Sequence, residues 1–327
     1  MARMDTFEQI GDAFALTAPA ERRRMLVIVN PYATTVSDRL RHLVVAALQG
    51  RYHVQAIDTN AKGHATQLAR EAAEEGYDVV VAFGGDGTLN EAANGLAGSA
   101  TPLTPLPGGS ANVFGKMLGI PGDIVDATEH LLLMADDWRP RKVDLPSVNG
   151  RHFTFAAGLG LDASVVKRID EHPYRKRRFG AYYFTAVAIA DFSAHYVFNP
   201  PQIDVHLTGG KTLDGVTLIV QNSDPFTFFD NRPIRAAEGA TLESGTLAGI
   251  VMERSTPTIM PGVIWRAFSK TARLVKHRAI TNFADVDELT AVVTDGRPVP
   301  LQVDGDYIGD VLEARFAIAP GALSVVS

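Results

Sequence analysis

The sequence has no cysteine among its 327 residues. It can therefore form neither a disulfide nor a thiolate metal site, and a cysteine nucleophile is excluded. No apolar run reaches the roughly 18 to 20 residues that a helix needs to cross a bilayer. The nearest approach, residues 181–192, is too short and is flanked by charge. The nine histidines contain no HExxH pattern or other close ligand pair, which argues against a zinc enzyme.

An excess of basic residues is also missing, because 31 Lys and Arg oppose 37 Asp and Glu, for a net charge of -6. General nucleic-acid binding needs a broad basic face, so no nucleic-acid partner is predicted. Residues 1–24 lack the continuous apolar core of a signal peptide and are interpreted as an N-terminal extension of a cytoplasmic protein. Any membrane contact would then be peripheral, without a transmembrane segment.

What the sequence does contain is enough apolar material for a packed core, since 46% of its residues are hydrophobic and 21% are charged. The length favours two domains of roughly 150 residues each, with a cleft between them. We expect the active site in that cleft.

The first predicted domain, residues 25–144, is an α/β nucleotide-binding domain. The continuous apolar run at residues 25–29 and the segment 78–83, which is apolar after Asp78, are typical of buried parallel strands. Helical apolar spacing follows them, at residues 37–48 and 88–96. This alternation predicts a parallel sheet covered by helices.

The second predicted domain, residues 145–310, is β-rich. Its short apolar segments favour an antiparallel, sandwich-like arrangement. One helix is expected across it, at residues 179–194. The last segment, residues 311–327, carries two further strands, and its return to the first domain is left open.

The strongest local pattern is Gly84-Gly85-Asp86-Gly87-Thr88, placed where a buried strand should turn into a helix. Glycines allow positive φ and close backbone approach to an anion, and a helix N-terminus offers unpaired N–H groups. Asp86 would repel a phosphate unless Mg²⁺ or a hydroxyl lies between them, which favours phosphoryl transfer. A tight turn with no ligand is the alternative. Neither a Walker A pattern nor a GxGxxG fingerprint occurs here.

The stretch GGDGTLNE, residues 84–91, resembles the nucleotide-loop signature of the diacylglycerol kinase catalytic family, which includes bacterial lipid kinases and sphingosine kinases. Other segments resemble the family's motifs in the same order. They are Asn30-Pro31, Gly63-His64-Ala65, residues 106–114, residues 143–163 and residues 302–306. The resemblance spans about residues 25–327.

This resemblance implies an ATP-dependent and Mg²⁺-dependent kinase that phosphorylates a lipid hydroxyl, with diacylglycerol as the first acceptor to consider. It also implies that residues 145–310 form the lipid-substrate domain. It implies that Asp304 is the catalytic base, that Asp86 positions the acceptor or the metal, and that Asp144 is a metal partner through water. The reverse assignment of Asp86 and Asp304 stays open. The nucleotide-binding residues would be Asn30, Gly84, Gly85, Gly87, Thr88, Glu91, Gly108, Ser110 and Asn112.

Two of these residues have simpler alternatives. Glu91 lies one turn into the expected helix, where it can equally cap backbone N–H groups. Asp304 precedes Gly305, and an Asp-Gly pair is also the signature of a hairpin turn.

The sequence departs from the family pattern at three positions. Val113 stands where relatives carry Asp, Ser244 where they carry the Asp of a structural Mg²⁺ site, and Asp306 where they carry Glu. Two other functions therefore remain in view. One is a soluble-substrate kinase resembling NAD kinases or phosphofructokinases, and the other is a catalytically silent, nucleotide-dependent binding protein.

Lipid contact is predicted from basic and aromatic segments. Residues 175–178 are all basic and could attract anionic headgroups, although a solvated loop is the alternative. The aromatic residues at 182–184 and 226–229 could line an acyl-chain groove or belong to the core. A homodimer is predicted by analogy. We expect the protein in the cytoplasm, peripherally associated with a membrane.

Overall fold

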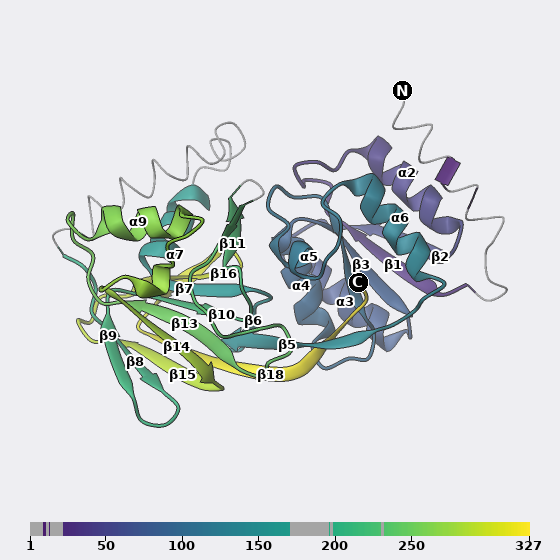
Figure 1. The fold of residues 1–327 in the computed structure, drawn as a ribbon. Helices are drawn as coiled ribbons and strands as arrows, with labels where there is room; N and C mark the ends of the chain where they lie inside the picture. The colour runs from purple at the N-terminus through teal and green to yellow at the C-terminus, as the bar shows by residue number, and fades with distance from the viewer. Residues whose placement is uncertain (1–8, 11–12, 14–21, 171–195, 197–198, 230–231) are drawn as a thin grey trace. The chain divides into compact units, whose positions relative to one another are not determined.

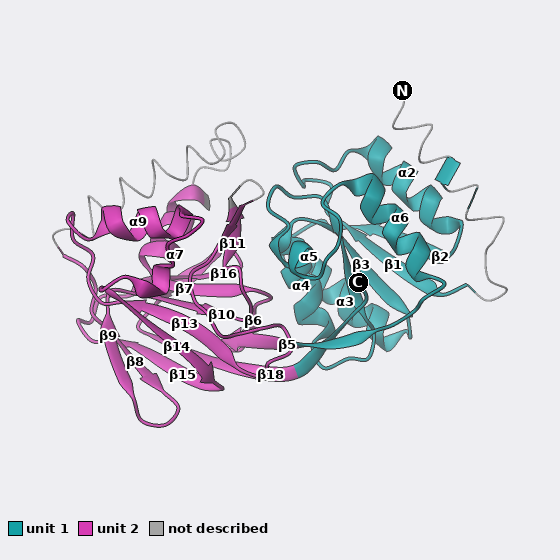
Figure 2. Cartoon of the chain, viewed as in Figure 1, with its two compact units in different colours: residues 1–143, 321–327 teal, residues 144–320 magenta. Residues whose placement is uncertain are grey.

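The computed structural model describes residues 9–10, 13, 22–170, 196, 199–229 and 232–327 (Figure 1). Several predictions fall outside these residues: most of the extension at 1–24, the basic residues 175–178, the aromatic residues 182–184 and the helix at 179–194. The chain divides into two compact units, shown in Figure 2. Unit 1 is residues 1–143 and 321–327, and unit 2 is residues 144–320.

Unit 1 is built on parallel strands in the order β2-β1-β3-β4. Their bounds are β1 Arg24–Val29, β2 His53–Asp58, β3 Val79–Gly84 and β4 Leu103–Pro107. All residues of β3 and β4 are buried, as expected for parallel strands covered on both faces. The chain returns at its end, because Val325 pairs in parallel with Leu103. The predicted α/β domain with a parallel sheet is confirmed.

The described helices of unit 1 are α2 Asp38–Gln49, α3 His64–Glu74, α4 Asp86–Leu96, α5 Val113–Met117 and α6 Ile124–Met134. The helix α6, which begins at the N-cap Asp123, was not predicted. Helices α3 and α4 pack closely, since a Cβ on Gly95 would lie 2.3 Å from the Thr66 carbonyl oxygen. This packing fixes the helix that carries the first glycine loop.

Unit 2 is β-rich and its two main sets of strands pair antiparallel. One sheet has the order β14-β13-β10-β7-β16-β17. In the other, β18, β15, β8 and β9 are successive antiparallel neighbours. The bounds are β5 Arg141–Val148, β6 Arg151–His152, β7 Ala156–Gly160, β8 Ile203–Leu207, β9 Thr212–Gly215, β10 Thr217–Gln221, β13 Leu247–Met252, β14 Ile280–Val286, β15 Glu288–Val293, β16 Val299–Val303, β17 Asp306–Val311 and β18 Glu313–Val325. A short pair, β11 Thr227–Phe229 and β12 Arg232–Ile234, stands apart.

Two cores explain this arrangement. Strand β13 is buried throughout and alternates, with Leu247 and Val251 in the core between the sheets and Ala248 and Ile250 in a second core. The second core also takes Met260 of helix α9 Met260–Phe268 and Leu274 of the 3₁₀ helix η2 Leu274–Lys276. The predicted antiparallel β-rich domain is confirmed. The helices α7 Leu161–Asp170 and α9 were not predicted.

Candidate functional site

The first glycine loop joins the buried strand β3 to helix α4 within a single residue, Gly85. The helix begins at Asp86, two residues before the predicted start at Thr88. Asp86 and Gly87 therefore lie in the first helical turn, and the N-cap Gly85 offers no side-chain cap. The N-terminal N–H groups of α4 are left to a ligand or to solvent.

The second glycine turn packs directly on the first. The Gly108 amide donates to the Gly84 carbonyl at 2.9 Å. A Cβ on Gly109 would lie 2.7 Å from the Gly85 Cα, and one on Gly108 would lie 2.9 Å from the Gly84 Cα. None of these four glycines has a positive φ. Their role in this structure is close backbone approach rather than left-handed conformation.

Asp86 and Asn112 hold this pair of loops together. The Asp86 Oδ1 accepts a hydrogen bond from the Val113 amide at 2.7 Å, so one carboxylate serves the first turns of both α4 and α5. Asn112 is in the left-handed region with φ 47°, and its side chain bonds both the N–H and the C=O of Gly109. Ser110 is exposed at the tip of this turn.

Asn30 connects the end of β1 to the same helix. Its Nδ2 donates to the Thr88 Oγ1 at 3.0 Å, and its Oδ1 accepts from the Tyr32 amide at 3.0 Å. Thr88 is buried, and a Cβ on Gly84 would lie only 2.6 Å from its Oγ1. In this structure the hydrogen bond between Asn30 and Thr88 connects the end of β1 to the first turn of α4 and so stabilises the glycine loop.

Glu91 caps backbone N–H groups, but those at the start of α3 rather than those of its own glycine loop. Its carboxylate accepts hydrogen bonds from the amides of Gly63 and Ala65, at 2.8 and 3.2 Å. These amides belong to the start of α3, whose N-cap Gly63 supplies no side-chain cap of its own. Of the two alternatives for Glu91, these contacts favour capping.

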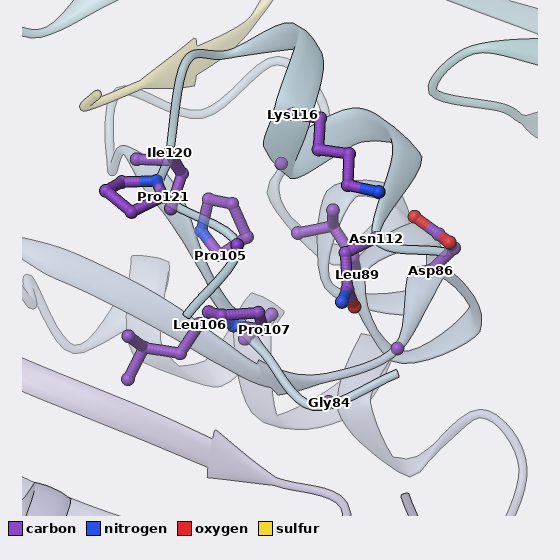
Figure 3. Close-up of a pocket in the computed structure, with 14 residues that line it drawn as sticks. Gly84, Asp86, Leu89, Pro105, Leu106, Pro107, Asn112, Lys116, Ile120 and Pro121 are labelled. Carbon is purple, nitrogen blue, oxygen red and sulfur yellow. The ribbon is translucent and has the colours of Figure 1, made fainter. Parts of the chain in front are cut away.

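A cation that sequence reasoning missed lies in this region. Lys116 of α5 lines a pocket together with Gly84, Gly85, Asp86 and Asn112. Figure 3 shows its side chain extending toward Asp86. A usable signal was present, because Lys116 is the single Lys or Arg between Arg70 and Arg139. An amine at the glycine loops suits phosphate oxygens.

Asp304 lies in unit 2 and forms the hairpin turn between β16 and β17. Asp304 and Gly305 both have positive φ, 49° and 82°, as a type I′ turn requires. The carboxylate is buried and accepts four hydrogen bonds. The donors are the amides of Thr154, Phe155 and Ala156 and the Thr154 hydroxyl, at 2.7 to 3.1 Å. Burial raises the pKa of Asp304, against these hydrogen bonds, which favour the charged form.

Asp144 also lies in unit 2 and holds the loop that contains Ser244. Its Oδ2 accepts from the Gly245 amide at 2.6 Å. The Ser244 hydroxyl instead closes its own turn with the carbonyls of Thr241 and Thr246. In the described part of the chain, no three His, Cys, Asp or Glu side chains gather to hold a metal. The role of Asp144 as a metal partner stays a prediction.

A second acidic residue close to Asp304 has a shifted pKa. Asp162, at the start of α7, accepts a hydrogen bond from the Gln302 Nε2 at 2.7 Å. The Gln302 Oε1 in turn accepts from the Gly305 amide at 2.8 Å, which links Asp162 to the Asp304 hairpin. Burial raises the pKa of Asp162 to about 6, and the hydrogen bond from Gln302 lowers it only in part.

This pKa gives a stability prediction. The unfolded Asp has a pKa of about 3.9, so between pH ~4 and ~6 the folded protein binds more protons and loses stability as pH rises. Asp162→Asn removes this loss. We expect the unfolding free energy of the variant, relative to wild type, to increase by on the order of 2 kcal/mol from pH 4 to pH 7. Urea unfolding at both pH values measures it. Asp214→Asn, at an exposed position, serves as control. An equal change in unfolding free energy between pH 4 and pH 7 for Asp162→Asn and wild type would contradict the expectation.

The predicted site residues thus fall into two groups. Unit 1 brings together Asn30, Asp86, Thr88, Asn112 and the glycines. Unit 2 holds Asp304 in the turn between β16 and β17 and Asp144 in strand β5.

Comparison with known proteins agrees with this arrangement. Residues 24–144 match the family model described as diacylglycerol kinase catalytic domain, so the resemblance predicted from the sequence is confirmed. That segment contains β1 to β4 and both glycine loops.

Individual relatives extend the comparison. A diacylglycerol kinase of Staphylococcus aureus strain MRSA252 is 37% identical over 144 residues, which cover 42% of this chain and 44% of that protein. The chain thus spans less than half the length of the curated relatives it matches. The crystal structure of a diacylglycerol kinase from Bacillus anthracis str. Sterne aligns with 94% of this chain and 98% of that chain, at a TM-score of 0.67 and 20% identity. A second structure from that organism reaches 0.75 over 95% of this chain at 21% identity. These structures share the fold of both units.

Proposed function

We propose that this protein is an ATP-dependent lipid kinase that transfers the γ-phosphate to a lipid hydroxyl, with diacylglycerol as acceptor and phosphatidic acid as product. The observation that carries the proposal is the packed pair of glycine loops with Asp86 between them, inside the segment that matches the diacylglycerol kinase catalytic domain. Phosphoryl transfer needs an anion cradle, a positive charge and a carboxylate near the reacting groups. Unit 1 offers candidates for all three.

The residues present fit nucleotide phosphates. The N-cap of α4, Gly85, supplies no side-chain cap, so the N-terminal N–H groups of this helix can face a phosphate. Lys116 lines the same pocket and adds a positive charge. The backbone N–H groups of Gly85 to Thr88 and the Lys116 amine would hold the phosphates, while Asn30 and Thr88 keep the loop in place.

Mg²⁺ would be held mainly by oxygen atoms of the nucleotide. Asp86 is the one acidic residue among those that line this pocket in the described structure. Its Oδ1 accepts a hydrogen bond from the Val113 amide, so the carboxylate lies at the start of both α4 and α5. One carboxylate with substrate phosphates and water is a usual Mg²⁺ environment, and the ion supplies charge neutralisation there when bound.

The acceptor side of the proposal rests on unit 2. A general base must have a lone pair directed at the hydroxyl that it deprotonates. The four hydrogen bonds to Asp304 hold its carboxylate in the hairpin, so catalysis by Asp304 would require one of them to be exchanged for the acceptor. Asp162, with a pKa of about 6, is closer to the value that suits a base near neutral pH. The assignment of the base to Asp304 is therefore the part most worth testing.

Transfer of labelled phosphate from ATP to detergent-dispersed lipids tests the proposal, with NAD as a soluble acceptor for comparison. Asp86→Asn is the informative variant, because the Asn Oδ1 can still accept from the Val113 amide while the charge is lost. We expect lipid phosphorylation by wild type and a fall in kcat of about a hundredfold or more in the variant, with little change in melting temperature.

Asp78→Asn provides the control, since Asp78 bonds the Arg24 amide at the opposite end of β3. Phosphorylation of NAD but of no lipid would instead support a soluble-substrate kinase. ATP binding without transfer to any acceptor would support a binding protein. Equal activity of wild type and Asp86→Asn would remove Asp86 from the reaction.

A further inference from the structure

Helix α9 of unit 2 exposes a cluster of large apolar side chains. Ile264, Trp265 and Phe268 are 47%, 61% and 52% exposed, although residues of these types are usually buried. Their spacing of one, three and four residues places them together on one side of a single helical turn. We call them the α9 apolar cluster.

The adjacent side of α9 is anchored. Met260 is buried in the second core of unit 2, and Val263 packs against that core. A Cβ on Gly262 would lie 3.0 Å from the His277 Nε2, so the helix approaches the segment after η2 closely. Pro261 lies in the first turn, where its missing N–H costs no hydrogen bond. The α9 apolar cluster is therefore held outward by a packed helix.

The chain around this helix carries one sign of charge. Residues 254–284 contain six Lys or Arg and no Asp or Glu, within a protein whose net charge is -6. All but Arg266 of the six are exposed: Arg254, Lys270, Arg273, Lys276 and Arg278. Arg273 forms an ion pair with Glu238, and Arg266 lies over the Trp265 ring at 5.8 Å. We call these six residues the α9 basic segment.

We propose that the α9 apolar cluster and the α9 basic segment form a docking surface for a bilayer that contains anionic phospholipid. Trp and Phe side chains partition into the boundary between headgroups and acyl chains, and Lys and Arg bind the anionic headgroups beside them. Each basic residue near such a surface contributes about fivefold in affinity. Here α9 carries the apolar cluster and Arg266, and the other five basic residues come from the chain just before and after the helix. Apolar and basic side chains in one region are typical of interfacial binding.

A second copy of this chain fits the surface less well. A two-fold interface would place the same patch on both subunits, so the basic segment of one copy would face that of the other. No acidic residue of residues 254–284 would offset this repulsion. Charge complementarity thus selects the anionic bilayer.

The proposed docking surface rests on the proposed function, because a lipid kinase must reach an acceptor that resides in a membrane. Its test does not rest on that function. Binding to vesicles is measured without ATP, and phosphorylation is measured separately with short-chain diacylglycerol in non-ionic detergent. A protein that binds vesicles but phosphorylates nothing would fail the proposed function alone.

Trp265 can report its own insertion. The chain has two tryptophans, and Trp138→Phe leaves Trp265 as the single one. Trp138 contacts Arg23 in unit 1, so its replacement is remote from α9 in the sequence and in the unit division. We expect the emission of Trp265 to shift to shorter wavelength with phosphatidylglycerol vesicles and to stay unchanged with phosphatidylcholine vesicles.

Co-sedimentation with phosphatidylglycerol vesicles measures the affinity of variants. Trp265→Ala with Phe268→Ala should lower the partition coefficient about tenfold or more. Lys270→Glu with Lys276→Glu should lower it more than tenfold, and higher salt should weaken wild-type binding. The matched controls are Leu133→Ala with Leu312→Ala, which are also half exposed, and Lys62→Glu with Lys211→Glu. Both controls should bind as wild type does.

Three results would overturn the proposal. One is wild-type protein that does not bind phosphatidylglycerol vesicles, and another is equal binding by wild type and both α9 variants. The third is a change of oligomeric state in the α9 variants, seen by sedimentation without vesicles, which would assign the cluster to a second copy. Thermal melting of each variant checks folding, and the Trp265 emission supplies evidence from a chain whose α9 is intact.

Discussion

Replacing Asp304 with alanine should lower the unfolding free energy by about 4 kcal/mol, because three buried backbone N–H groups would lose their acceptor. Those groups belong to Thr154, Phe155 and Ala156, and the Thr154 hydroxyl loses the same partner. Alanine would also occupy a position with φ 49°, which favours Asp, Asn or Gly. Urea unfolding at neutral pH measures the change.

Asp285→Ala separates the two causes. Asp285 has a similar φ of 58° but is exposed, so its replacement carries the strain of the left-handed region without the buried amides. We expect a loss of about 1 kcal/mol there. A loss of similar size in both variants would mean that the hydrogen bonds to Asp304 contribute little.

The same residue tests the assignment of the catalytic base. In Asp304→Asn, the asparagine can adopt the left-handed conformation and keeps one oxygen acceptor. We therefore expect a measurable fraction of this variant to stay folded at the assay temperature. If Asp304 is the base, kcat per folded molecule should fall by about a thousandfold. If its role is only to hold residues 154–156, activity should follow the folded fraction, and Asp162→Asn becomes the variant to test next.

The two-domain organisation followed from features that are local in sequence. The apolar residues at 25–29 and 79–83 lie in β1 and β3, because a parallel strand buried on both faces has no polar side to expose. The glycine loop was located correctly for a related reason. A buried strand that ends at glycine and is followed by helical apolar spacing predicts a loop at that point.

The conformation of that loop was not predicted correctly. Positive φ was expected to be part of the reason for the glycines, yet Gly84, Gly85, Gly108 and Gly109 all have ordinary φ values. Their need for a missing Cβ arises from packing between two loops that are more than 20 residues apart, and no local pattern reports such a contact. Asp86 and Glu91 are further examples, since their partners Val113 and Gly63 are 27 and 28 residues away.

Helix α9 was missed for a different physical reason. It has apolar residues on two sides, one packed against the second core and one exposed, so its pattern lacks the polar face that marks a surface helix.

Asp304 was interpreted from its neighbours in sequence. The amides that surround its carboxylate come from residues about 150 positions earlier, and only the folded sheet brings them together.

Gly109→Ala should disrupt the proposed nucleotide site by forcing the two glycine loops apart. Its Cβ would lie 2.7 Å from the Gly85 Cα, and rotation of a side chain can move neither atom away. One loop must move, at a cost of about 2 kcal/mol in stability. A displacement of about 1 Å at a phosphate cradle should weaken ATP binding about a hundredfold.

Gly122→Ala is the matched control, because Gly122 lines the same pocket, has an ordinary φ and has open space where a Cβ would be. Its melting temperature and ATP affinity should equal those of wild type. Titration calorimetry with ATP and thermal unfolding measure both quantities in both variants. If Gly109→Ala unfolds earlier but binds ATP as wild type does, the contact between the loops serves the fold alone and the nucleotide lies elsewhere in unit 1.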